Sequence, residues 1–314
     1  MSFKLPDYPS PQASVHELAD YAEFVALLRT TCSARDVESY LGRIDDNAYN
    51  VGIEDSDLEN ERLSDGMMLE LSRRQEACGG GYPFGLSASG TLLEKRFEES
   101  EARHWIYAYL LFATRLNMSS ERQKAGINGT DLLERLSASV LCQHLGRDRA
   151  RSIVFGTSAG GSFPDKINTL CRDIREGGNF DHKDTGYVQA NDDGLDVVGW
   201  IPFSDRKPSK LSVFGQCKTG TSWEEVKTEL QPEAFIKRWM SRSFAIDPLR
   251  AFFVSESADN SRWFGTAVYT GLLFDRCRIV DFSNDIDSGL SVDIETWTKA
   301  AIADLETSSW AQTA

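Results

Sequence analysis

The stretch "NDDGLDVVGW", residues 191–200, places acidic residues and a glycine directly before an apolar run. A second apolar run, "KLSVFGQCK" at residues 210–218, ends on a glutamine and a lysine. Both runs are rich in valine and aromatic residues, which favours strands, and the polar segment "SDRKPS" between them is typical of a turn. Apolar strands do not need carboxylates and an ammonium group to fold, so this region is the first candidate for a functional site.

The alternation of side chains along a strand predicts how these polar groups are arranged. Gln216 and Lys218 should point to one face of the sheet and Cys217 to the other, where its thiol would be part of the core. If the two strands are hairpin neighbours, Asp196 lies beside Gln216 and Lys218. Gly194 allows the backbone to turn sharply into the first strand.

An aspartate, a second oxygen ligand and a lysine suit metal-assisted hydrolysis of a phosphodiester. Mg²⁺ prefers oxygen ligands from one or two carboxylates, together with water and substrate phosphate. The metal lowers the pKa of its bound water and stabilises charge on the phosphate. The lysine can position that water or neutralise the developing charge.

The segments "GLDVVGW" and "FGQCK" resemble the PD-(D/E)xK restriction-endonuclease-like superfamily, and most closely its Mrr-like branch. The resemblance covers about residues 130–230. It implies that Asp196 binds the metal, that Gln216 replaces the usual second acid as a ligand, and that Lys218 is catalytic. It also implies a cofactor, Mg²⁺ or Mn²⁺, and a mixed sheet flanked by helices.

The family places a glutamate on a helix before the sheet, and "TDLLERLSASVLCQHLG" at residues 130–146 offers Glu134 as a third metal ligand. Asp165 and Glu176 are the alternatives for this role. The sequence departs from the usual pattern through an insertion at residues 147–190, so the assignment of Glu134 depends on how that segment packs. Gln216 is uncharged, so metal affinity would depend more on Asp196 and the helix glutamate.

Simpler interpretations of the same residues exist. The cluster of Asp196, Gln216 and Lys218 could protect a sheet edge against pairing, and Glu134 alone could be a solvated helix residue. Acids in a turn, such as Asp192 and Asp193, are more often turn formers than ligands. The tryptophans at positions 200 and 223 are interpreted as packing residues.

A competing motif is "GTSAG" at residues 156–160, which matches the nucleophile elbow G-x-S-x-G and follows an apolar run. It resembles the patatin-like lipases, with Ser158 as nucleophile, Asp193 in an Asp-Gly pair and "GGG" at residues 79–81 as the oxyanion loop. The context differs, because "GSFP" intervenes before the next helix and because the glycine run and Asp193 are at unsuitable separations from Ser158. The alternative interpretation is a loop of small residues after a strand.

The composition is that of a globular protein, with 41% hydrophobic and 26% charged residues and a net charge of −14. Bulk attraction to phosphate is therefore absent, and a nucleic-acid substrate would require a local basic patch or a partner protein. The chain has no apolar run of membrane-spanning length and no signal-peptide pattern at its start, so we expect a cytoplasmic protein without membrane contact. The six cysteines lack a metal-like spacing, which predicts reduced thiols and no structural zinc.

The order of elements predicts an α/β protein with a mainly helical N-terminal part. We expect a helical partner-binding or regulatory domain at residues 1–125 and a nuclease-like domain at residues 126–314. A capping box formed by Ser14 and Glu17 should begin the first helix. The predicted helices span residues 14–30, 34–44, 62–78, 91–118, 130–146, 163–178, 222–240 (interrupted near Pro232) and 293–307. The predicted strands span residues 151–157, 195–203, 210–218 and 249–257, and the segment 262–282 should hold a helix or extended segment followed by a strand.

The resemblance implies a metal-dependent nuclease, and favours a DNA endonuclease of bacterial antiphage defence that acts with a partner ATPase or sensor. The alternatives are a patatin-like serine hydrolase and a catalytically silent scaffold with the nuclease fold. Whether DNA or RNA is cut, and whether the chain forms a homo-oligomer, stays open.

Overall fold

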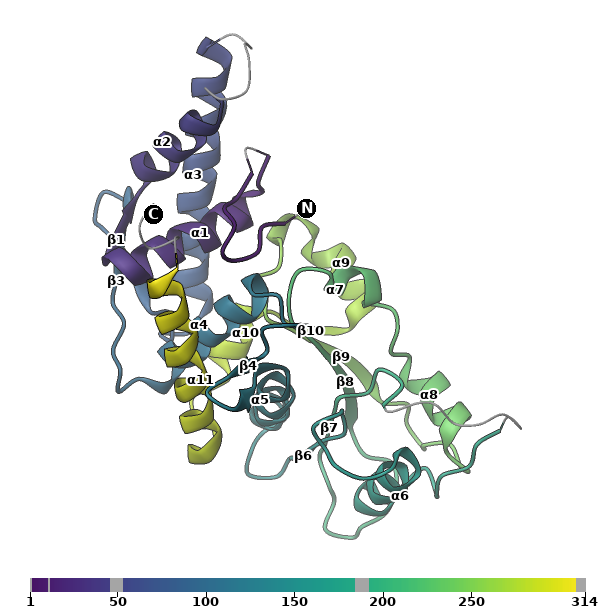
Figure 1. Ribbon diagram of the computed structural model, residues 1–314. Coiled ribbons are helices and arrows are strands. Elements are labelled where there is room, and N and C mark those ends of the chain that lie inside the picture. Colours follow the sequence, from purple (N-terminus) through teal and green to yellow (C-terminus); the bar gives the residue numbers. More distant parts are fainter. Residues whose placement is uncertain (1, 11, 46–52, 184–191, 309–314) are drawn as a thin grey trace.

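The computed structural model describes residues 2–10, 12–45, 53–183 and 192–308, and shows helices packed around a five-stranded mixed sheet (Figure 1). The helices are α1 (Val15–Arg29), α2 (Ala34–Asp45), α3 (Ile53–Ala77), α4 (Ala102–Arg115), α5 (Gly129–His144), α6 (Phe163–Ile174), α7 (Trp223–Val226), α8 (Pro232–Trp239), α9 (Trp263–Thr270), α10 (Arg276–Asp281), α11 (Ser288–Thr307) and the 3-10 helix η1 (Asn260–Arg262). The α/β class predicted from the sequence is confirmed.

The central sheet has the strand order β10-β9-β8-β7-β6. Its strands are β6 (Arg151–Val154), β7 (Val197–Trp200), β8 (Ser212–Lys218), β9 (Leu249–Val254) and β10 (Leu272–Phe274). Strands β6, β7 and β8 are antiparallel neighbours, whereas β8, β9 and β10 run parallel. The predicted β7–β8 hairpin is therefore confirmed.

Each face of the sheet is covered by different helices. Val197 and Val213 belong to the core that contains α5, while Val198 and Phe214 belong to the core that contains α6 and α8. Because neighbouring residues in a strand point to opposite faces, α5 lies on one face and α6 with α8 on the other. The continuous apolar character of β7 and β8 follows from this burial on both faces.

The N-terminal part is mainly helical and carries a small sheet of β1 (Thr31–Ser33), β3 (Leu92–Lys95) and β2 (Phe84–Leu86), in that order. A short hairpin of β4 (Gln123–Lys124) and β5 (Ile127–Asn128) precedes α5. One hydrophobic core runs from Phe3 to Leu305, and the C-terminal helix α11 packs against α4 (Figure 1). The domain boundary predicted between residues 125 and 126 stays a prediction.

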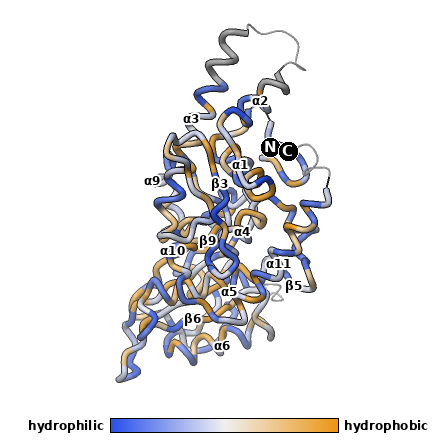
Figure 2. Tube along the Cα trace, turned by 90° about the vertical axis from the view of Figure 1, so that its left-hand side faces the viewer, coloured by the Kyte–Doolittle hydropathy of each residue, from blue (hydrophilic) through white to orange (hydrophobic). Residues whose placement is uncertain are grey.

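Most helices carry hydrophilic and hydrophobic residues together (Figure 2), as expected where one side covers a core. The predicted capping box is present: Ser14 Oγ accepts a hydrogen bond from the Glu17 N–H, and the Glu17 carboxylate accepts one from the Ser14 N–H. All six cysteines are free, as predicted. Among the described residues, none of the helices combines the length and apolar character that crossing a membrane requires.

One predicted element was wrong. The single helix predicted at residues 91–118 is the strand β3 followed by α4, because β3 pairs with β1, about 60 residues earlier, and with β2 across a short turn. The segment 262–282 holds the helix α9 followed by the strand β10, as predicted, and the helix α10 follows them. Asp275 caps α10 by accepting a hydrogen bond from the Arg278 N–H, which fixes the start of that helix.

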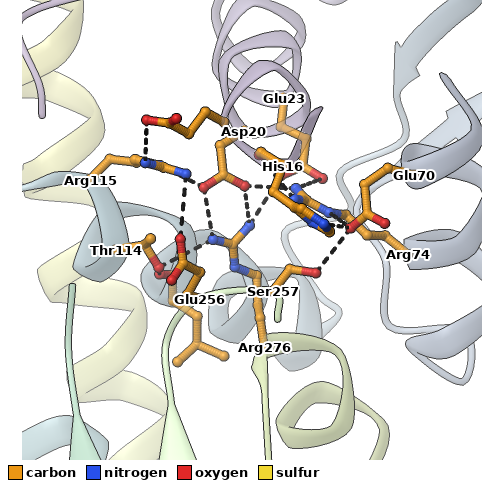
Figure 3. Close-up of polar contacts among 12 residues, drawn as sticks. His16, Asp20, Glu23, Glu70, Arg74, Thr114, Arg115, Glu256, Ser257 and Arg276 are labelled. Carbon is orange, nitrogen blue, oxygen red and sulfur yellow. Dashed lines mark hydrogen bonds and ion pairs between the residues drawn. The ribbon is translucent and has the colours of Figure 1, made fainter. Parts of the chain in front are cut away.

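A buried network of charged side chains connects the N-terminal helices with the segment that follows β9 (Figure 3). Arg276 on α10 donates to Asp20 at 2.8 Å and to the carbonyl of Ser255 at 3.0 Å. Arg74 and Arg115, both fully buried, also donate to Asp20, each at 2.7 Å. Burial alone would raise the pKa of Asp20, but the three guanidinium groups hold it well below its usual range.

Candidate functional site

The predicted site residues meet where the hairpin of β7 and β8 ends. The pairing of Val197 with Gly215, continued by one residue, sets Asp196 opposite Gln216. The Asp196 N–H donates to the carbonyl of Gly215 at 2.9 Å, and its carboxylate accepts a hydrogen bond from the Cys217 N–H at 2.6 Å. The aspartate is thus fixed at the strand end by backbone groups of β8.

Gln216 and Lys218 lie two residues apart on β8, and a glutamate that the sequence did not indicate joins them. The amide nitrogen of Gln216 donates to the Glu229 carboxylate at 2.7 Å, and the ammonium of Lys218 lies 3.9 Å from the same oxygen. Gln216 is fully buried, whereas 39% of the Lys218 side chain is exposed. Glu229 is therefore a common partner of Gln216 and Lys218, at the point where the buried site meets solvent.

Glu134 on α5 approaches the same end of the sheet through the loop after β6. Its carboxylate accepts hydrogen bonds from the Ser158 hydroxyl, from the Ser158 N–H at 3.2 Å and from the Thr157 hydroxyl at 3.3 Å. A Cβ added at Gly156 would lie 2.6 Å from the Glu134 carboxyl and would displace it, so glycine here lets the carboxyl approach the loop. The carbonyl of Asp196 accepts hydrogen bonds from the N–H groups of Phe155 and Gly156, which anchors the loop beside Asp196.

Burial and neighbouring groups shift the pKa values of both carboxylates. Burial raises the pKa of Asp196 well above its ordinary value, opposed by the Cys217 N–H, and the Glu134 carboxylate raises it further. Burial likewise raises the pKa of Glu134, against the hydrogen bonds from Ser158. Lys218 lowers the pKa of Asp196, but less than these causes raise it. The site therefore holds two buried acids whose pKa values are raised, and Lys218 only partly compensates for this at Asp196.

The donor set fits a hard divalent cation. The amide oxygen of Gln216 is buried and has no hydrogen-bond partner among the described residues, and such an atom is normally satisfied by a ligand or water. Together with the carboxylates of Asp196 and Glu134, it offers the oxygen ligands that Mg²⁺ and Mn²⁺ prefer. In the described part of the chain, no three His, Cys, Asp or Glu side chains form a metal-binding group, so the glutamine oxygen is essential to this assignment.

The other sequence candidates occupy structural positions. Asp192 accepts a hydrogen bond from the Gly194 N–H, and Asp193 accepts one from the Trp239 indole at 2.7 Å, as expected of turn residues. Asp165 lies in the first turn of α6 and accepts from the Ser162 hydroxyl. Glu176 is buried in an ion pair with Lys210 at 2.8 Å. Of the three acids considered for the helix role, Glu134 is the one that acts electrostatically on Asp196.

The residues of the patatin-like interpretation contact different parts of the protein. The Ser158 hydroxyl donates to Glu134, while Asp193 interacts with Arg238 and Trp239. The run "GGG" at residues 79–81 lies against Arg103, Val280 and Asp281. Trp200 and Trp223 are buried, which confirms their predicted packing role.

Comparison with known proteins gave no further assignment: no protein-family model, no curated protein and no solved structure matches the chain. The function must therefore be argued from the chemistry of the site.

Proposed function

We propose that this chain is a metal-dependent nuclease with a restriction-endonuclease-like core, and that DNA is its substrate. The observation that carries the proposal is the amide oxygen of Gln216, which is buried and has no hydrogen-bond partner within the described residues, on the strand that also carries Lys218. A structural hydrogen-bond cluster would satisfy this oxygen internally. The residue types, their order in the chain and the mixed sheet all support the PD-(D/E)xK interpretation.

Each residue has a role that follows from its position. Asp196, Glu134 and the Gln216 oxygen would hold the cation. When bound, Mg²⁺ or Mn²⁺ would supply positive charge at the scissile phosphate and an ionised water. Lys218, which is partly exposed, would orient the attacking water or neutralise charge on the phosphate. Glu229 is a positioning residue, because it fixes both Lys218 and Gln216 through one carboxylate oxygen.

The proposal is tested by incubating supercoiled plasmid with the full chain in Mg²⁺, in Mn²⁺ and in chelator. We expect nicked and linear DNA with either metal and intact DNA with chelator. The assay should be repeated with the candidate partner, an ATPase or sensor, since a net charge of −14 opposes DNA binding. Absence of cleavage with every metal and with the partner would contradict the nuclease function, while cleavage of RNA alone would correct the substrate.

Glu229→Ala should lower the cleavage rate by about tenfold to a hundredfold, since a misplaced catalytic group costs factors of this order. Half of the Glu229 side chain is exposed, but its loss leaves the buried Gln216 amide without an acceptor, so the free energy of unfolding should fall by about 1–3 kcal/mol. The matched control is Glu233→Ala, which removes an exposed acid of α8 that pairs with Lys237. Equal rates for the two variants, measured by plasmid nicking, would show that Glu229 does not position the site.

A further inference from the structure

The net charge of −14 leaves open how this chain would hold a polyanion, and one cleft supplies local positive charge. The cleft has a volume of about 540 Å³ and lies beyond the C-terminal ends of α6 and α8. We refer to it as the arginine cleft. Its lining includes Arg172, Arg175, Gly177, Gly178, Pro208 and Arg242.

The backbone brings the arginines of the cleft together. Arg175 ends α6 in the left-handed conformation (φ 58°), and Gly177 and Gly178 continue the turn with φ of 80° and 76°. The carbonyl of Gly177 accepts a hydrogen bond from the Arg242 N–H at 3.1 Å. A Cβ added at Gly178 would lie 2.3 Å from the Ser241 hydroxyl, so the close approach of the two chain segments requires glycine.

The acid in this cleft is already neutralised. Glu176 is buried, pairs with Lys210 at 2.8 Å and accepts hydrogen bonds from the N–H groups of Ser209 and Ala245. Arg175 and Arg242 are exposed, and within the described ranges neither has a side-chain hydrogen bond or an ion pair. The C-terminal ends of α6 and α8 carry about half a negative charge each. The positive charge of the Arg175 and Arg242 guanidinium groups exceeds this.

Further cations continue the basic surface beside the cleft. Arg206 and Lys207 are exposed and directly precede Pro208, which lines the cleft. Arg172 is 70% exposed and is only weakly engaged with Asp173, at 3.4 Å. Guanidinium groups with this freedom bind phosphate oxygens in a bidentate manner, which lysines do not reproduce.

The separation between the arginine cleft and the candidate site follows from the lengths of α6 and β8. Helix α6 has 12 residues and begins after the loop that binds Glu134, so its ends lie about 17 Å apart. Strand β8 has seven residues and ends at Lys218, which gives roughly 20 Å from its start near Lys210. A distance of about 20 Å corresponds to about six base pairs at 3.4 Å each.

We propose that the arginine cleft binds the phosphate backbone of a nucleic-acid duplex about six base pairs from the scissile phosphate. This inference rests on the proposed nuclease function and assigns the part of the chain that anchors the substrate. The contact is to the backbone, so it adds affinity without sequence preference.

The test is fluorescence anisotropy of a labelled 30-base-pair duplex with the full chain, in chelator and over a salt series. Arg175→Ala/Arg242→Ala should weaken binding by about tenfold and reduce the slope of log K against log salt by about two. The matched control, Arg35→Ala/Arg62→Ala, removes two exposed arginines from α2 and α3 and changes the net charge equally. We expect its affinity and slope to stay within experimental error of the wild type.

The outcomes separate the two proposals. If the wild type binds and cleaves DNA while the cleft variant keeps its affinity and slope, the cleft proposal is wrong and the nuclease stands. Equal weakening in both double variants would show an effect of bulk charge and would also overturn the cleft proposal. A wild type that neither binds nor cleaves, with or without its partner, overturns both. Arg175→Lys/Arg242→Lys, which keeps the charge, should recover part of the lost affinity.

Discussion

Asp196→Asn is expected to reduce plasmid cleavage at least about a thousandfold, the order of loss seen when a preorganised electrostatic group is removed. The substitution removes a ligand charge but keeps the shape of the side chain and an oxygen that can accept the hydrogen bond from the Cys217 N–H. Because burial and Glu134 both raise the pKa of Asp196, the neutral side chain should not weaken the fold. The measurement is single-turnover cleavage in Mn²⁺, with circular dichroism and thermal unfolding as checks of folding.

Lys218→Met should reduce cleavage to a similar extent while leaving metal binding intact, since a lysine is not a ligand. Asp193→Asn is the matched control for Asp196→Asn. Asp193 lies three residues before Asp196 but interacts with Arg238 and Trp239. Full activity of both Asp196→Asn and Lys218→Met would exclude the proposed site. A silent scaffold would show no cleavage in the wild type and no change in metal binding on Asp196→Asn.

Ser158→Ala separates the nuclease from the serine hydrolase. Ser158→Ala removes the hydroxyl that donates to the Glu134 carboxylate and keeps the bond from the Ser158 N–H, so nuclease activity should fall by roughly tenfold through that ligand. A serine hydrolase would instead lose all ester hydrolysis in Ser158→Ala and none in Lys218→Met. Assaying DNA and an aryl ester with the same two variants distinguishes these outcomes.

The part of the site that lies on β7 and β8 could be predicted because its geometry is local. Strand alternation and a short hairpin are enough to predict Asp196 beside Gln216 and Lys218, and the pairing of Val197 with Gly215 agrees with that arrangement. Glu229 was missed because it lies in the connection between α7 and α8, eleven residues beyond Lys218. An isolated acid in such a connection has no distinguishing spacing, and only the fold shows that it contacts Gln216.

The error in secondary structure at residues 91–118 has a similar origin. This segment has helical propensity throughout, but β3 gains its hydrogen bonds from β1, about 60 residues earlier, and from β2 across a short turn. Tertiary pairing of this kind overrides local preference. The buried charges were also not predicted, because nothing in the sequence distinguishes the fully buried Arg276 from the partly exposed Arg278 two residues later.

Arg276→Met is expected to destabilise the protein by about 3–5 kcal/mol, the usual effect of removing one partner from a buried ion network. The side chain is fully buried and donates hydrogen bonds to Asp20, Glu23, Thr114 and the carbonyl of Ser255. Its loss leaves buried carboxylates with less compensating charge. The control is Arg262→Met, which removes a 73% exposed arginine 3.9 Å from Asp259 and should cost less than about 0.5 kcal/mol.

The destabilisation should extend to the candidate site, because Ser255 connects the buried charge network to strand β8. The Ser255 N–H donates to the carbonyl of Lys218, and its hydroxyl accepts hydrogen bonds from Thr114 and from the Gly220 N–H. Urea unfolding gives the free energy, and hydrogen exchange of the amides of β8 and β9 tests the connection. We expect faster exchange in β8 and β9 of Arg276→Met than in Arg262→Met. If Arg276→Met unfolds within about 1 kcal/mol of the wild type, the network in Figure 3 does not hold the N-terminal helices on the sheet.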